Sequence, residues 1–188
     1  MKIILGSGSS SRKRVLTEMG ISFDVLTADI DEKAIRDPDP SALVLKLAQA
    51  KAQAILPKIG EPAILITADQ VVVSNGEICE KPRDADEARK FFLQYPSHPP
   101  ECINGLCVTN TATGKSACAN DRTRIVFRPI PADVVEAWIA EGRSFRAAGG
   151  FYAESPEFAP YVVSIDGPPD SCSGLPKDLL RSLIEQVK

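Results

Sequence analysis

Apolar residues along the chain form short unbroken runs and stripes at helical spacing, which predict strands and helices respectively. Residues 63–73 form a long apolar run, and the Asn75-Gly76 pair after it is a strong signal for a hairpin turn. The predicted strands are residues 2–6, 23–27, 63–73, 78–79, 101–109, 115–128 and 161–165. The predicted helices are residues 10–19, 40–56, 84–93, 131–140 and 179–187.

Residues with special backbone properties mark the ends of these elements. Ser10 or Ser11 can cap the first helix, and Gly20 can end it. Pro40 suits the first turn of the second helix, and Pro57 ends it. Helices and strands alternate but include hairpins, so the order predicts an α/β fold with a mixed sheet flanked by helices.

Composition limits the classes to which the protein can belong. The 188 residues suffice for one domain, or for two small lobes that share a core, and 44% of them are hydrophobic. The net charge of −3 argues against a general nucleic-acid binder. No apolar run approaches the ~20 residues that would span a membrane. The start of the chain gives way to Gly6 too soon for a signal peptide.

The five cysteines are odd in number and contain no CxxC pair. This pattern predicts neither a disulfide framework nor a zinc site. We therefore expect the protein to work in a reducing cytoplasm.

Asp69 interrupts the apolar run "ILITADQVVV" of residues 64–73. An unbroken run of this length is typical of a strand covered on both faces, where a carboxylate needs a partner, a proton or a metal. One interpretation ends the strand near Thr67 and leaves Asp69 in solvent. The other makes Asp69 a general base or metal ligand, because Val71 to Val73 resume the run immediately.

The hairpin turn brings a lysine into the same region. A two-residue turn at Asn75-Gly76 pairs Val73 with Ile78 and Gln70 with Lys81. Lys81 then lies near Asp69, either as a plain ion-pair partner or as a group that holds phosphate.

Lys51 lies on the apolar stripe of the helix at residues 40–56, four residues from both Leu47 and Ile55. The common outcome is a lysine whose stem packs while its ammonium reaches water. Together with Asp69 and Lys81, the alternative is a cationic cleft.

The stretch "LGSGSSSR" of residues 5–12 follows the first predicted strand and matches neither GxxxxGK[ST] nor GxGxxG. It can be an ordinary flexible turn. It can also bind an anion, because glycines permit close approach, helix N–H groups are free and Arg12 is a planar donor.

Six motifs in this order resemble the Maf family of nucleoside triphosphate pyrophosphatases, over nearly the whole chain. The matching stretches are "LGSGSSSR" (5–12), "DIDEK" (29–33), "LAQAKA" (47–52), "TADQ" (67–70), "GEICEKP" (76–82), and "AGGF" (148–151) with "GLP" (174–176).

The resemblance implies hydrolysis of the bond between the α- and β-phosphates of a nucleotide, with a divalent cation such as Mg²⁺ or Mn²⁺. It implies one Maf-like domain over residues 1–188, with an elongated mixed sheet in two lobes and a central cleft. Asp69 would accept the proton of the attacking water, and Glu32 would help to bind the metal. The residues implied to hold phosphate or substrate are Ser7, Ser9, Ser11, Arg12, Lys51 and Lys81.

Base preference differs between branches of this family. Gln70 and Glu154 are similar to the branch that prefers 7-methyl-GTP, and a carboxylate can accept two hydrogen bonds from guanine. Ser11 stands where that branch usually has tryptophan.

The alternative functions are a dTTP/UTP or ITP pyrophosphatase and a nucleotide-binding regulator of cell division with little turnover. The protein can also form a homodimer. Trp138 is expected in the core.

Overall fold

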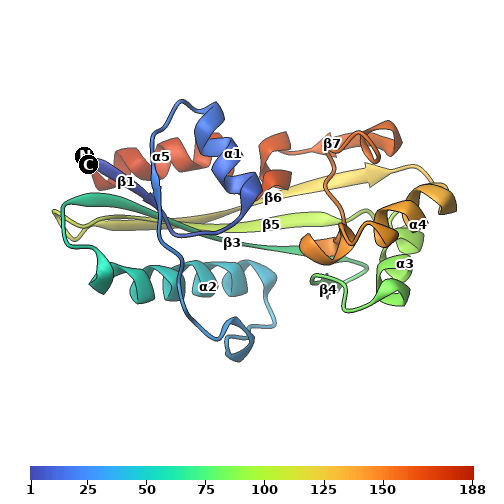
Figure 1. Ribbon diagram of the computed structural model, residues 1–188, viewed down its shortest axis with the longest axis horizontal. Coiled ribbons are helices and arrows are strands. Elements are labelled where there is room, and N and C mark those ends of the chain that lie inside the picture. Colours follow the sequence, from blue (N-terminus) through green and yellow to red (C-terminus); the bar gives the residue numbers. More distant parts are fainter. The chain divides into compact units, whose positions relative to one another are not determined.

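The computed structural model describes residues 1–188 and contains a seven-stranded mixed sheet and five α-helices (Figure 1). The strands are β1 (Lys2–Leu5), β2 (Asp24–Val25), β3 (Ala63–Ser74), β4 (Glu77–Cys79), β5 (Glu101–Asn110), β6 (Ser116–Phe127) and β7 (Val162–Asp166). The helices are α1 (Ser10–Glu18), α2 (Pro40–Ile55), α3 (Ala85–Gln94), α4 (Ala132–Ala140) and α5 (Lys177–Val187).

The strand order is β2-β1-β3-β5-β6-β7, with β4 paired to β3. β1 runs parallel to both β2 and β3, whereas the β3–β4 and β6–β7 pairs are antiparallel. The mixed α/β sheet predicted from the order of helices and hairpins is therefore confirmed.

The chain divides into two compact units. Unit 1 contains Met1–Asp69, Asn104–Asp121 and Ser173–Lys188, and unit 2 contains Gln70–Ile103 and Arg122–Cys172. The strands β3, β5 and β6 contribute residues to both units. The central cleft implied by the family resemblance stays a prediction.

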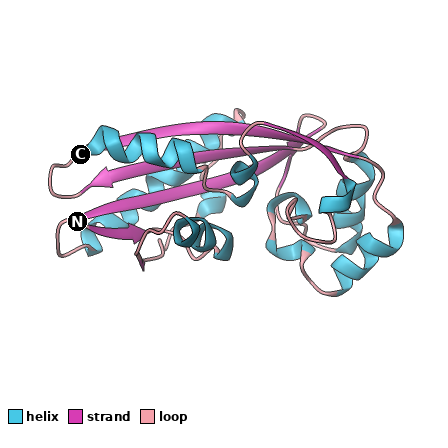
Figure 2. Ribbon diagram, turned by 90° about the horizontal axis from the view of Figure 1, so that it is seen from above, coloured by secondary structure: helices cyan, strands magenta, loops and turns pink.

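Unit 1 is a three-layer arrangement in which the alternation of side chains along β3 decides what each face contacts. Ile64, Ile66 and Ala68 pack in a cluster with residues of α1 and α5. Ala63 and Leu65 point the other way and pack with residues of α2. Figure 1 shows α1 and α5 on one side of these strands and α2 on the other. Both chain termini lie at the same end of unit 1 (Figure 2).

A glycine on β5 lets α2 lie directly against the sheet. A Cβ built on Gly105 would come within 2.5 Å of the Val44 carbonyl carbon and oxygen. These are backbone atoms of a helix, which cannot move aside as a flexible side chain would. Gly105 thus sets the distance between α2 and the sheet.

Unit 2 is built around a cluster of aromatic rings. The polar atoms of two of these rings have backbone partners: the Tyr95 hydroxyl donates to the Gly149 carbonyl at 2.6 Å, and Trp138 Nε1 donates to the Gly150 carbonyl at 2.8 Å. Trp138 is 1% exposed, which confirms its expected place in the core. The rings in contact are those of Phe92, Tyr95, Phe127, Trp138, Phe151, Tyr152 and Phe158.

Three expectations from the sequence are wrong in detail. Ser9, not Ser10 or Ser11, caps α1, because its side chain accepts from the Arg12 N–H. The strand expected at residues 23–27 is shortened to Asp24–Val25. The β3–β4 ladder stops at the Val72–Cys79 pair, so the Gln70–Lys81 pair does not form, although Val73 does pair with Ile78.

The expectation that the cysteines form no disulfide is also wrong. Cys107 on β5 and Cys118 on β6 are joined, 11 residues apart in sequence. The antiparallel hairpin brings the two residues opposite each other, which cysteine spacing alone does not reveal. Cys79, Cys102 and Cys172 form no disulfide. No helix has the length and apolar character needed to cross a membrane.

We predict that Gly105→Ala lowers the free energy of unfolding by about 1–3 kcal/mol, because the added methyl group would clash with the backbone of α2. Urea unfolding followed by circular dichroism measures the change. Gly60→Ala is the matched control, since a Cβ there meets nothing within 4 Å. Equal stability of the two variants would contradict this account of the α2 contact.

We predict that Cys118→Ser lowers the free energy of unfolding by about 2–3 kcal/mol under non-reducing conditions, because it opens the loop closed by the disulfide. Adding dithiothreitol should destabilise the wild type by a similar amount and leave the variant unchanged. Cys172→Ser, which removes a free thiol, serves as control. A wild type insensitive to reductant would show that this bridge contributes no stability.

Candidate active site

Asp69 is the last residue of unit 1 along β3, and it shares a face of the strand with Leu65 and Thr67. Because Leu65 packs with α2 residues, this face looks toward α2. The strand does not end at Thr67, so the interpretation that leaves Asp69 in solvent is wrong: the residue is 9% exposed.

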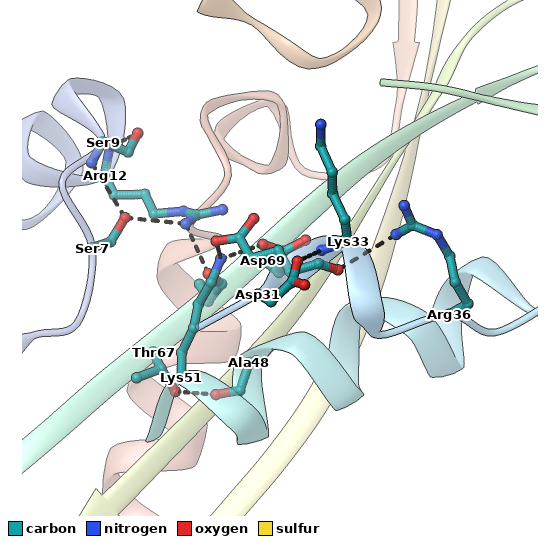
Figure 3. A network of polar contacts seen from close by, with 12 residues as sticks. Ser7, Ser9, Arg12, Asp31, Lys33, Arg36, Ala48, Lys51, Thr67 and Asp69 are labelled. Carbon is teal, nitrogen blue, oxygen red and sulfur yellow. Dashed lines mark hydrogen bonds and ion pairs between the residues drawn. The ribbon is translucent and has the colours of Figure 1, made fainter. Parts of the chain in front are cut away.

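The Lys51 side chain extends from α2 and contacts this carboxylate. Its Nζ lies 2.5 Å from Asp69 Oδ1 (Figure 3). The same Nζ lies 3.0 Å from Glu32 Oε1. The side chains of Lys51 and Asp69 are 11% and 12% exposed, whereas that of Glu32 is 55% exposed. Lys51 therefore does not extend into open water, and its ammonium holds two carboxylates from different segments.

The buried Thr67 hydroxyl fixes the position of α2 beside these groups. It donates to the Ala48 carbonyl at 2.8 Å, one turn before Lys51. Thr67 is not among the site residues predicted from the sequence. The sequence feature that could have identified it is its polar side chain in the apolar run, two positions before Asp69 and hence on the same face of the strand.

Arg12 extends from α1 into the interior of unit 1. Its Nε donates to the Gly174 carbonyl at 3.0 Å, and its Nη1 donates to the Ala68 carbonyl at 2.8 Å and to Ser7 Oγ at 3.2 Å. Burial lowers the pKa of the guanidinium, while the negative charges of Asp69 and Glu32 act in the opposite direction. Arg12 thus connects the N-terminal loop, the end of β3 in unit 1 and the loop before α5.

The serine-rich loop is ordered by its own hydroxyl groups. Ser7 Oγ accepts from the Ser9 N–H at 3.3 Å, and Ser9 Oγ accepts from the Arg12 N–H at 3.5 Å. Ser11 lies in the first turn of α1. The N-terminus of a nine-residue helix, with a serine cap and an arginine beside it, has the character of an anion site.

Glu32 is placed by a short 3₁₀ helix, Glu32–Ala34, which Asp31 caps by accepting from the Lys33 N–H. Glu32 and Asp69 offer carboxylate oxygens, the ligands that Mg²⁺ and Mn²⁺ prefer. The chain contains no group of three or more His, Cys, Asp or Glu residues that could hold a metal by itself. Two carboxylates fit a cation of this kind when phosphate oxygens and waters complete its coordination.

The other three predicted site residues belong to unit 2. Gln70 Nε2 donates to the Ser171 carbonyl at 3.0 Å and to the Cys172 carbonyl at 3.4 Å. Lys81 and Glu154 are exposed. The backbone before Lys81 is held by a hydrogen bond from the Gly149 N–H to the Glu80 carbonyl.

Within unit 1 the structure brings together Ser7, Ser9, Arg12, Lys51 and Asp69 (Figure 3). Glu32 joins them through its ion pair with Lys51, so the cluster comes from four separate stretches of sequence. This cluster joins a buried carboxylate, a second carboxylate and two cations. Such a set can polarise a water molecule and stabilise a phosphate.

Comparison with known proteins gives consistent matches over the full length. A protein of Dictyostelium discoideum named 7-methyl-GTP pyrophosphatase is 39% identical over 192 residues, with 98% of this chain and 96% of that protein covered. A nucleoside triphosphate pyrophosphatase of Streptomyces coelicolor is 32% identical, with coverages of 99% and 90%. A dTTP/UTP pyrophosphatase of Pelotomaculum thermopropionicum is 30% identical, with coverages of 98% and 96%.

The family described as Maf-like protein matches residues 2–187. This match covers all the segments that build the cluster in unit 1, from the serine-rich loop to the loop before α5. The chain therefore belongs to the Maf-like protein family.

Proposed function

We propose that the protein is a nucleoside triphosphate pyrophosphatase, which hydrolyses the bond between the α- and β-phosphates to give a nucleoside monophosphate and pyrophosphate. The buried Asp69 carboxylate, held by Lys51 in the same unit as Arg12, is the observation that carries this proposal. The names of the related proteins support the same reaction.

Asp69 is the proposed general base. Its carboxylate accepts a proton from water as the water oxygen forms a bond to the α-phosphorus. The bond from that phosphorus to the bridging oxygen breaks, and pyrophosphate leaves with the bonding electron pair. Lys51 orients Asp69 through its 2.5 Å contact, so that the carboxylate is fixed before the substrate arrives.

The remaining polar groups are proposed to bind the phosphates. Ser7, Ser9, Ser11 and the N-terminus of α1 offer hydroxyl and N–H donors, and Arg12 keeps its Nη2 group for a ligand while its other donors hold the fold. Lys81 is proposed to bind phosphate from unit 2. A bound Mg²⁺ or Mn²⁺, held by Glu32 and Asp69, would neutralise charge on the phosphates.

The proposed substrate is 7-methyl-GTP, with Gln70 and Glu154 in unit 2 recognising the base. Because Gln70 directs its amide N–H groups at two backbone carbonyls, what it offers a ligand is its acceptor oxygen. Guanine presents the N1–H and amino group as neighbouring donors, which suits an acceptor from Gln70 and a carboxylate from Glu154. A dTTP/UTP preference remains the alternative, because a relative with that name is 30% identical.

Three further expectations remain proposals. The cytoplasm is the proposed location, although the Cys107–Cys118 disulfide is a feature that reducing compartments disfavour. A homodimer is a further proposal. A regulator of division that binds nucleotide with little turnover is disfavoured by the placement of Asp69 and Lys51, which serves chemistry better than binding alone.

We predict that Asp69→Asn reduces pyrophosphate release by about 10²- to 10⁴-fold, since the amide cannot accept the proton of water. Binding of a non-hydrolysable nucleoside triphosphate, measured by calorimetry, should stay within a few-fold of the wild type. Asp178→Asn on α5 is the control, because that side chain is 95% exposed. Pyrophosphate release at the wild-type rate by Asp69→Asn would remove Asp69 as the base.

We predict that Glu154→Gln lowers kcat/KM for 7-methyl-GTP by about 10- to 100-fold, through loss of charged hydrogen bonds to the base. The same change should affect UTP and dTTP much less, and ITP to an intermediate extent, because its base keeps N1–H but lacks the amino group. Initial rates with all four nucleotides measure both effects. A wild-type preference for a pyrimidine would contradict the role given to Glu154 without touching that of Asp69.

A further inference from the structure

The two carboxylates suited to hold a divalent cation share one internal cation. Lys51 Nζ lies 3.0 Å from Glu32 Oε1 and 2.5 Å from Asp69 Oδ1, so the ammonium lies between them. Glu32 and Asp69 are 37 positions apart in sequence and have no direct bond to each other that would explain their meeting. The ammonium accounts for their proximity.

Of the two lysines on α2, only Lys51 is placed to contact both carboxylates. Its stem lies between buried Leu47 and Ile55, and only its end reaches the carboxylates. Lys46, on the same helix, forms an ion pair with Asp37 at 2.6 Å, and its side chain is 54% exposed. The chain therefore contains two lysine–carboxylate pairs on α2, one buried at the cluster and one at the surface.

We propose that Lys51 is a built-in counter-cation that competes with the divalent metal for Glu32 and Asp69 in the protein without nucleotide. In the nucleotide-free protein a divalent metal alone therefore binds weakly, and it binds tightly only together with the triphosphate. This inference rests on the proposed function for the identity of the triphosphate, but the competition concerns only residues of unit 1.

Electrostatics favours this exchange. An ammonium and a divalent cation cannot both lie between the two carboxylates without strong repulsion, because the side chains of Lys51 and Asp69 are largely withdrawn from water. A lysine ammonium is a compact charge on a flexible stem, with three donors that can turn to a new acceptor. Phosphate oxygens supply such acceptors, so the arrival of nucleotide gives Lys51 a second place to donate its hydrogen bonds.

A purely structural role for Lys51 predicts the opposite result. If the lysine only holds Glu32 and Asp69 in place, its removal disorders the carboxylates and weakens metal binding. If it competes, its removal strengthens metal binding while lowering turnover. The sign of the change in metal affinity thus separates the two roles.

The test measures binding of Mn²⁺ alone, without nucleotide, by electron paramagnetic resonance of the free ion. We expect Lys51→Met to bind Mn²⁺ at least about tenfold more tightly than the wild type, because a close charge competitor is removed. Lys46→Met should match the wild type. Adding Glu32→Gln to Lys51→Met should cancel the gain. Unchanged or weaker Mn²⁺ binding by Lys51→Met would overturn the proposal.

Removal of Lys51 leaves two facing carboxylates and can impair folding. In that case thermal unfolding gives the readout, because a ligand that binds only the folded state raises the melting temperature. Mn²⁺ should then stabilise Lys51→Met more than it stabilises the wild type, and failure to do so would overturn the proposal. Lys51→Arg keeps the charge and should show no tighter binding than the wild type.

The outcome is separable from that of the proposed function. A wild type that releases pyrophosphate, with a Lys51→Met variant that gains no Mn²⁺ affinity, refutes the competition alone. A Lys51→Met variant that gains affinity, in a protein that hydrolyses no nucleotide, refutes the function alone.

Discussion

The ion pair between Lys51 and Asp69 is the constraint on which the arrangement of unit 1 depends. A carboxylate on a covered strand face needs an ionic or hydrogen-bonding partner, and here the partner comes from the helix packed on that face. The pair is formed only if α2 lies close to the sheet, which Gly105 permits, and in one register, which the Thr67 hydroxyl fixes through Ala48. Packing and charge therefore specify the same position for the helix.

The buried Arg12 follows the same rule with different partners. Its guanidinium is satisfied by backbone carbonyls of Ala68 and Gly174 and by Ser7 Oγ, with the carboxylates farther off. Because these acceptors come from three distant segments, satisfying one buried charge brings together both ends of the chain and β3. The cluster forms because each buried charged group needs hydrogen-bonding or ionic partners, and these partners lie on segments distant in sequence.

Much of this could be predicted from sequence, because the relevant signals are local. Asp69 stands out in an apolar run and Lys51 on an apolar stripe, and strand alternation and helix periodicity are short-range properties. The Cys107–Cys118 bridge could not be predicted, since it depends on the register of β5 and β6. The Gln70–Lys81 pair failed because β4 ends at Cys79, before Pro82, which has no N–H to extend a ladder.

Stability alone does not account for the cluster. Replacing a buried ion pair by apolar side chains of similar volume is often neutral or stabilising, because desolvation offsets the attraction between the charges. Lys51 already lies on a stripe with Leu47 and Ile55, and Asp69 lies on a strand rich in isoleucine and valine, so apolar residues would fit both positions locally. The half-exposed Glu32 adds a second carboxylate to the same ammonium, and together the two carboxylates balance the charges of Lys51 and the buried Arg12. Two carboxylates that share one lysine ammonium are instead what the proposed exchange of that ammonium for a metal cation requires when a phosphate arrives.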